Sequence, residues 1–163
     1  MNCAQTNRCG TGFDTQTPNP GASGNGKITN GTNGLTALVV DDNPGMLKLA
    51  ARMLKELGYE VHMASEGAEA LFHFHSSPCK LVLTDYEMPA INGYQLGRKI
   101  KSKVPKIRVV IMTGLDRAAV AGLMSDESID GWLFKPFHLE ELETLLERVG
   151  LPGRTAAESP SIA

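Results

Sequence analysis

The chain of 163 residues has few of the features that mark several large classes of protein. Its three cysteines, Cys3, Cys9 and Cys79, form no Cys-x-x-Cys pair, so neither a disulfide framework nor a zinc site is favoured. Its apolar runs are strand-sized, far below the roughly 18 residues that a membrane helix needs. The net charge of −2 predicts no general attraction to nucleic acids or membranes, so we expect no direct DNA binding. Because the N-terminus lacks an apolar signal core, we expect a cytoplasmic protein.

Composition divides the chain into three parts. In residues 1–34, 22 of the 34 residues are Gly, Asn, Thr, Pro or Ser. Such a segment buries too little apolar surface to offset its ordering entropy, so we expect a disordered head. Residues 151–163 are expected to form a flexible tail. The periodic hydrophobic signals all lie in residues 35–150, which predicts a single folded domain there.

Within residues 35–150, short apolar runs alternate with amphipathic segments. Five such strand-and-helix units predict a parallel sheet with helices on both faces. Right-handed crossovers leave few topologies, and we expect the flavodoxin-like strand order 2-1-3-4-5 of a doubly wound α/β fold. The expected strands cover residues 35–40, 60–64, 81–84, 108–112 and 131–134.

For two of the expected helices, the sequence predicts particular boundaries or a buried face. The second begins at Ser65, with Ala68, Leu71 and Phe74 on its inner face. The fourth covers residues 117–124, where the hydrophobic spacing is less regular than in the other helices.

Four of the five expected strands end in residues that can carry chemistry. Asp41 and Asp42 follow the first strand, and Asp85, Thr113 and Lys135 follow the third, fourth and fifth. In open parallel sheets, ligands bind beyond the carboxyl ends of the strands. Two carboxylates about 5 Å apart repel by roughly 3 kcal/mol at an effective dielectric constant of 20, and a divalent cation would offset that repulsion. All-oxygen ligands favour Mg²⁺ over zinc, and Mg²⁺ often shares its shell with a phosphate, so a phosphoryl acceptor is predicted.

Four blocks of this sequence resemble the signature blocks of the bacterial two-component response regulator receiver domain. The resemblance covers about residues 35–150, in order and with plausible spacing. It is closest to the stand-alone, single-domain type that includes the chemotaxis regulators. The blocks are VDDNPGMLKLAARMLKELGY, LTDYEMPAINGYQL, VVIMTG and GWLFKPF.

The resemblance implies a role for each residue that matches a family motif. Asp85 would be the phosphoacceptor. Asp41 and Asp42 would form the acidic pocket, in which Asp42 and Asp85 bind Mg²⁺ directly. Glu87 would add a backbone carbonyl ligand.

The resemblance also implies a switch. Thr113 would contact the phosphoryl group and Lys135 would pair with it, while Lys135–Pro136 would be a cis peptide bond. Trp132 occupies the switch position, where the family usually has Phe or Tyr, so the usual coupling between the threonine and the aromatic ring is in question. Glu87 and Leu115 lie at positions that tune phosphoryl lifetime in receivers.

The function implied is Mg²⁺-dependent acceptance of a phosphoryl group from a sensor histidine kinase or a histidine phosphotransfer protein. The output face would be formed by helix four, strand five and helix five, and the protein would be a monomer or a phosphorylation-dependent dimer. We expect no enzyme in the usual sense, because the domain promotes only its own phosphorylation and dephosphorylation. Because only 14 residues follow Val149, the output is expected to be a separate protein.

Two other functions stay open at this point. A phosphohydrolase of the haloacid-dehalogenase type uses similar residues, although its nucleophile follows the first strand and its acidic pair comes late. A degenerate receiver could serve as a constitutive binding module. Gly21–Lys27 also matches most of a P-loop, but Ile28 stands where a Ser or Thr should meet Mg²⁺ and no strand precedes it.

Overall fold

The computed structural model describes residues 34–153. The predictions for the head and the tail therefore lie almost wholly outside the described residues. The described part contains five strands and five helices in strict alternation. The strands are β1 (Thr36–Val40), β2 (Glu60–Ala64), β3 (Leu81–Asp85), β4 (Arg108–Thr113) and β5 (Gly131–Phe134). The helices are α1 (Pro44–Glu56), α2 (Gly67–Ser76), α3 (Gly93–Lys103), α4 (Arg117–Val120) and α5 (Leu139–Arg148).

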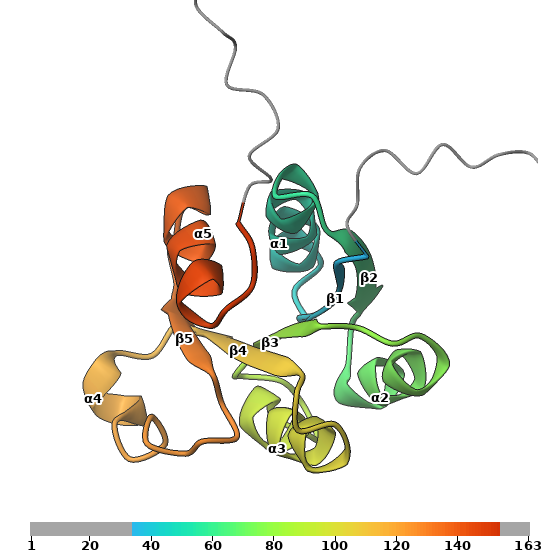
Figure 1. Cartoon of the computed structure of the whole chain (residues 1–163). Coiled ribbons are helices and arrows are strands. Elements are labelled where there is room, and N and C mark those ends of the chain that lie inside the picture. Colours follow the sequence, from blue (N-terminus) through green and yellow to red (C-terminus); the bar gives the residue numbers. More distant parts are fainter. Residues whose placement is uncertain (1–33, 154–163) are drawn as a thin grey trace, which may run out of the picture.

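The five strands form one parallel sheet in the order β2-β1-β3-β4-β5, which confirms the predicted flavodoxin-like topology. Figure 1 shows α1 and α5 on one face of the sheet and α2, α3 and α4 on the other. The neighbouring strands β1 and β3 lead to helices on different faces, α1 and α3, so the loops after β1 and β3 leave the sheet in opposite directions. A crevice at this switch point is where such folds bind ligands.

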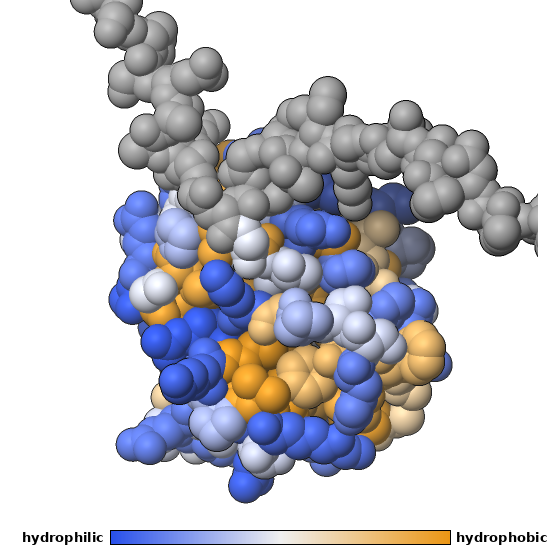
Figure 2. Space-filling view, turned by 45° about the vertical axis from the view of Figure 1, so that its right-hand side comes forward, coloured by the Kyte–Doolittle hydropathy of each residue, from blue (hydrophilic) through white to orange (hydrophobic). Residues whose placement is uncertain are grey.

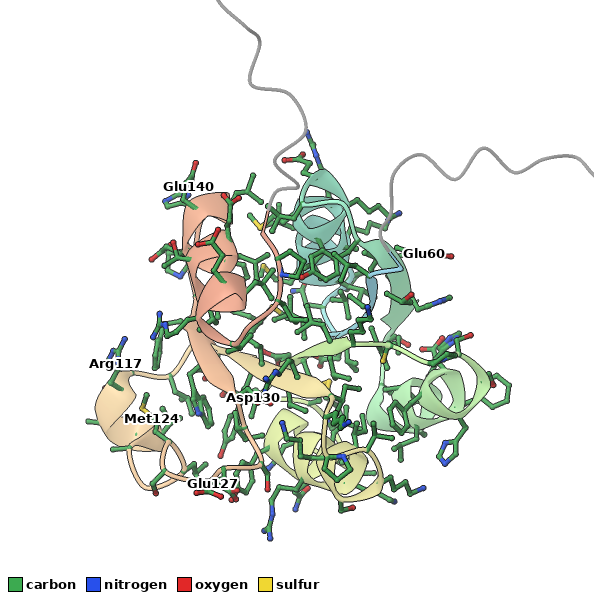
Figure 3. All side chains as sticks on the ribbon, in the orientation of Figure 1. Glu60, Arg117, Met124, Glu127, Asp130 and Glu140 are labelled. Carbon is green, nitrogen blue, oxygen red and sulfur yellow. The ribbon has the colours of Figure 1, made fainter. Side chains whose placement is uncertain are left out.

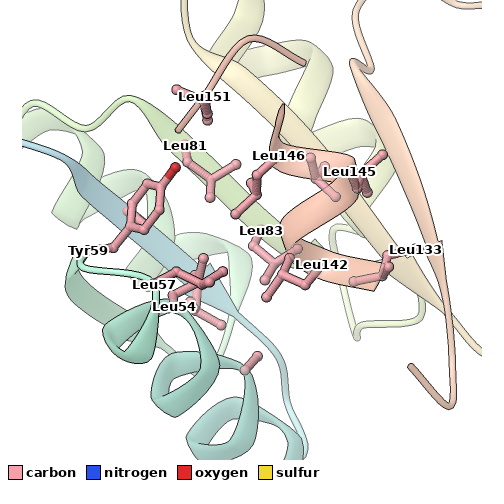
Figure 4. Close-up of a cluster of buried hydrophobic side chains, with 14 of the residues drawn as sticks. Leu54, Leu57, Tyr59, Leu81, Leu83, Leu133, Leu142, Leu145, Leu146 and Leu151 are labelled. Carbon is pink, nitrogen blue, oxygen red and sulfur yellow. The ribbon is translucent and has the colours of Figure 1, made fainter. Parts of the chain in front are cut away.

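Each face of the sheet has its own apolar core. Under α1 and α5, Leu54, Leu142 and Leu146 pack on alternate residues of the central strands (Figure 4). The other core lies under α2 and α3 and includes Leu96 and Ile100. Because β1, β3 and β4 are covered on both faces, their side chains are almost all buried, as expected for parallel strands.

Helix α2 differs from its prediction. It begins at Gly67 rather than Ser65. Ala68, which was predicted on the inner face, is exposed, and Ala70 is buried in its place, so the prediction was wrong for Ala68. Leu71 and Phe74 do pack against the core. In Figure 2, which brings the side of α2 forward, apolar residues gather in the lower part of the surface. Phe72 of α2 is 69% exposed.

Helix α4 is much shorter than predicted. It ends at Val120 and is followed by turns, where the pattern predicted helix to residue 124. Gly122 lies just beyond the end, and glycine is costly inside a helix. Val120 alone is buried in this helix, so little tertiary packing supports a longer one.

Local signals start the helices that flank the carboxyl edge of the sheet. The Asn43 side chain accepts hydrogen bonds from the backbone N–H groups of Gly45 and Met46, and Pro44 occupies the first helical turn of α1. Asn92 and Gln95 form a capping box at the start of α3. These caps fix where the chain leaves each strand end. No helix within residues 34–153 is long and apolar enough to cross a membrane.

Candidate acidic site at the carboxyl edge of the sheet

The parallel register brings the predicted site residues to one edge of the sheet. Asp41 directly follows β1, Asp85 ends β3 and Thr113 ends β4. Lys135 directly follows β5, and its backbone N–H donates to the Thr113 carbonyl at 2.7 Å. Residues separated by up to 94 positions in sequence thereby meet around one point.

Lys135 joins two of the carboxylates. Its Nζ donates to Asp85 Oδ1 at 2.7 Å and to Asp41 Oδ2 at 3.0 Å. Both carboxylates are nearly inaccessible, with side-chain exposures of 6% for Asp85 and 1% for Asp41. The other oxygen of Asp41 accepts from the backbone N–H of Asn43 at 2.8 Å. Within residues 34–153, Asp85 Oδ2 accepts no hydrogen bond, so the two oxygens of this carboxylate differ.

The electrostatics of the site are set first by burial and then by the bonds between Lys135 and the carboxylates. Burial raises the pKa of Asp85; the Lys135 ammonium opposes this, whereas the charges of Asp41 and Asp42 add to it. For Lys135, burial would lower the pKa, but hydrogen bonds and charge from Asp85 and Asp41 outweigh it and the net pKa is raised. One lysine thus leaves a surplus of negative charge among three carboxylates.

The three carboxylates suit a hard divalent cation. One oxygen each from Asp41, Asp42 and Asp85 lies within 4.8 Å of the others. Asp42 is exposed whereas the other two are buried, so the cluster opens to solvent on one side. Mg²⁺ prefers carboxylate oxygens and keeps several waters, which an open side can accommodate. The donor set therefore fits Mg²⁺.

Thr113 is buried beside this cluster, and its hydroxyl oxygen accepts from the backbone N–H of Leu115 at 3.0 Å. That bond belongs to the loop leading into α4. The hydroxyl hydrogen has no acceptor among residues 34–153. The Thr113 hydroxyl can therefore donate to an acceptor that these residues do not supply.

The start of α3 packs tightly against the end of β3. A Cβ atom on Gly93 would lie 2.0 Å from the Asp85 carbonyl oxygen, so only glycine fits there. The Gly93 N–H donates to the Tyr86 carbonyl at 3.1 Å. The position of Asp85 and the start of α3 are therefore mechanically linked.

Trp132 lies partly buried next to this edge on β5. Its ring centroid is 6.0 Å from that of Tyr86, and its indole Nε1 is buried with no hydrogen-bond partner among the described residues. Glu87 is exposed, and its carboxylate lies near Gly114, just after Thr113. The Lys135–Pro136 peptide bond is cis.

A cleft of about 720 Å³ separates α4 from α5 alongside β5. Sequence reasoning proposed this face but missed its details. The Arg117 guanidinium lies 4.8 Å from the Phe134 ring centroid, and Glu140, Thr144 and Arg148 of α5 line the opposite wall. The labelled positions of Arg117 and Glu140 in Figure 3 show the two sides of this cleft. Because Glu140, Thr144 and Arg148 are spaced four residues apart, the sequence could have predicted that they share one face of α5.

These features define a class of protein. A buried carboxylate bonded to a lysine, beside two further carboxylates at the switch point of a 2-1-3-4-5 sheet, is typical of a phosphoaspartate signalling domain rather than of a classical enzyme. The chain belongs to the response regulator receiver domain family, whose model matches residues 37–147. Receivers of this family act in two-component phosphorelays.

Individual relatives support this placement. The response regulator MprA of Mycobacterium ulcerans is 35% identical over 128 residues, covering 75% of this chain and 54% of that protein. This chain thus spans about half the length of such curated relatives. Among solved structures, the chemotaxis protein CheY4 of Vibrio cholerae matches with a TM-score of 0.65 and 26% identity, covering 71% of this chain and 98% of that one. The response regulator TrrA of Thermotoga maritima, solved with Mg²⁺ and BeF, matches with a TM-score of 0.64 and 31% identity, over 71% and 98% of the two chains.

Proposed function

We propose that residues 35–150 act as a receiver that accepts a phosphoryl group on Asp85 from a phosphohistidine of a sensor kinase or a phosphotransfer protein. The observation that carries the proposal is the asymmetry of the Asp85 carboxylate. Its Oδ1 accepts from Lys135 at 2.7 Å, whereas Oδ2 has no partner within residues 34–153. One oxygen is held in place while the other is available as a nucleophile.

The transfer is a single displacement at phosphorus. A lone pair of Asp85 Oδ2 forms the new O–P bond as the P–N bond to the donor histidine breaks, and the departing imidazole nitrogen takes a proton from solvent. Lys135 stays bonded to Oδ1 and offsets part of the charge on the transferred oxygens. The Thr113 hydroxyl would donate its free hydrogen to one of those oxygens.

Mg²⁺, held by Asp42, Asp85 and the Glu87 carbonyl with Asp41 completing the acidic pocket, would supply charge neutralisation for the entering phosphoryl group. The clustering of the three carboxylate oxygens within 4.8 Å supports this assignment. The solved TrrA complex with Mg²⁺ and BeF shows that a 31% identical relative binds such a pair.

The proposed readout is the face made by α4, β5 and α5. The cleft there reaches from the Thr113 loop, at Gly114 and Leu115, to the far end of α5 at Arg148. Trp132 lines it, and the indole N–H has no partner within residues 34–153. A change at Thr113 would alter the wall of this cleft and with it the affinity for an output partner or a second copy of the chain.

Labelling with radioactive acetyl phosphate tests the assignment. The wild-type protein is expected to gain one acid-stable, base-labile phosphoryl group in the presence of Mg²⁺, and none with EDTA. Asp85→Asn is expected to abolish labelling, since an amide oxygen is a poor nucleophile. Asp116→Asn is the matched control, because Asp116 is no member of the acidic cluster and asparagine can still accept the Ala119 N–H that Asp116 accepts at 2.8 Å. Stoichiometric labelling of the Asp85→Asn variant would refute the proposal.

A further inference from the structure

The segment between α4 and β5 is held to the rest of the fold at few points. Helix α4 is a single turn, and in residues 117–130 the buried side chains are those of Val120 and Ile129. Figure 3 labels Met124 and Glu127 on this segment, which passes from α4 toward α3 before it enters β5. A segment with so few buried apolar contacts opens easily unless polar contacts restrain it.

Polar contacts tie this segment to α3 at two places, at Asp126 and, directly before β5, at Asp130, which accepts from Lys101. The Asp126 contact is the one nearer to α4. The Tyr94 hydroxyl donates to Asp126 Oδ2 at 2.5 Å, the short distance typical of a charge-assisted bond. The other oxygen of Asp126 accepts from the Ser128 N–H at 2.8 Å, and Arg98 Nε lies 3.6 Å from the carboxylate. This set of bonds lowers the pKa of Asp126 to about 2, led by the Tyr94 hydroxyl, so the carboxylate is ionised at neutral pH.

Tyr94 is itself fixed close to Asp85. It follows Gly93, which packs against the Asp85 carbonyl and donates to Tyr86 at 3.1 Å. The contact therefore runs from the end of β3, through the first turn of α3, to the far end of the segment after α4. At its other end, the segment is joined to Thr113 by the loop 114–116, in which the Leu115 N–H donates to the Thr113 hydroxyl oxygen.

We infer that the Tyr94–Asp126 bond is a latch that stabilises the unphosphorylated conformation of the domain. Tyr94 and Asp126 would act as positioning residues for the movement of Thr113 and the loop that follows it. The inference rests on the proposed function. For Thr113 to donate to a phosphoryl group on Asp85, its side chain must turn toward Asp85, and the Leu115 N–H that is bonded to its oxygen carries the loop 114–116 with it. Asp116 caps α4, so that helix moves as a unit with the loop. The latch holds the other end of the segment and opposes the displacement.

By linkage, removing a contact that favours the resting state must raise the affinity for a ligand that favours the phosphorylated state. Couplings between sites commonly amount to about 5- to 150-fold, and one partly exposed bond belongs at the low end. We therefore expect Tyr94→Phe to tighten binding of beryllium fluoride with Mg²⁺ by about fivefold. It should also speed labelling by acetyl phosphate by a similar factor.

The titration uses the full chain with beryllium fluoride and Mg²⁺, followed by the fluorescence of Trp132, the single tryptophan of the sequence. Tyr59→Phe is the matched control, since Tyr59 also donates one hydroxyl hydrogen bond, to the Pro152 carbonyl at 2.8 Å, away from the switch. Asp126→Asn keeps an oxygen for the Ser128 N–H while removing the charge. The double variant of Tyr94 and Asp126 should show no more than the larger single effect, because both changes break the same bond.

The outcomes separate the two proposals. If the wild type shows no Mg²⁺-dependent response and no labelling, the phosphoacceptor function fails and the latch fails with it. If the wild type responds and Tyr94→Phe binds with the same or weaker affinity, or no differently from Tyr59→Phe, the latch alone is overturned. Additive effects of the two latch variants would also overturn it.

Discussion

Asp130 is the ionic centre on which the amino-terminal edge of the sheet depends, far from the acidic site. It precedes β5, and its carboxylate accepts from Lys101 of α3, from Arg108 Nη1 at 2.9 Å and from the Val109 N–H at 2.8 Å. Its side chain is only 11% exposed, and that of Lys101 is 14% exposed. Figure 3 labels Asp130 just before β5, beside the start of β4. Helix α3 and two strands are joined through this one carboxylate.

The magnitude of its contribution follows from the burial of its partners. Removing one member of a buried pair typically costs about 3 to 5 kcal/mol, because the remaining charge stays buried without compensation. Lys101 keeps one bond, to the Ile107 carbonyl at 2.7 Å, and Arg108 is 41% exposed and contributes little. We therefore expect Asp130→Asn to lower the free energy of unfolding by about 3 kcal/mol, at the low end of that range.

Urea unfolding followed by far-UV circular dichroism at pH 7 measures this loss. Glu56→Gln is the matched control, because Glu56 pairs with Arg52 on the surface, with side-chain exposures of 45% and 79%. It should cost less than about 0.5 kcal/mol. Adding Lys101→Met to Asp130→Asn should recover at least about 1 kcal/mol by removing the stranded charge. A loss for Asp130→Asn no larger than that of the control would refute the reasoning.

The same pair predicts a pH dependence. Burial alone would raise the pKa of Asp130, but hydrogen bonds from Lys101, Val109 and Arg108 outweigh it and the net pKa is lowered. A carboxyl group whose pKa is lower in the folded than in the unfolded state stabilises the protein at pH values above its unfolded pKa, which is near 3.9. This stabilisation is lost as the pH falls through the folded pKa. The stability difference between the wild type and Asp130→Asn should therefore narrow below about pH 4. A difference that stays constant down to pH 3 would contradict this assignment.

Two backbone substitutions test the loop that follows Asp85. Ala90 has φ of 64° and is exposed, so Ala90→Gly should relieve a left-handed conformation and raise stability by about 0.5 to 1 kcal/mol in thermal or urea unfolding; a loss of stability would contradict the strain. Gly93→Ala places a Cβ 2.0 Å from the Asp85 carbonyl oxygen and should cost about 2 kcal/mol or more, with slower acetyl phosphate labelling; wild-type stability and labelling would show that the approach is not close.

Much of the fold could be predicted because the chain is locally consistent. Apolar runs of strand length alternate with helical spacing, and signals such as Asn43–Pro44 mark where helices start. Parallel pairing then places every strand end at one edge, so Asp41, Asp85 and Lys135 could be grouped from sequence. The prediction failed where tertiary packing decides the outcome, as in α4, whose pattern extends to residue 124 while only its first turn forms.

The sequence by itself determined the residue types, their positions at strand ends and the order of the units, because these depend on local periodicity and on the handedness of crossovers. Only the tertiary structure decided which oxygen of Asp85 is bonded to Lys135, that Tyr94 reaches Asp126 across 32 positions, and that Asp130 joins α3 to two strands. Such contacts depend on the angles at which helices cross the sheet and on the rotamers that packing allows. Those angles and rotamers are set by the whole core at once rather than by any one segment of the chain.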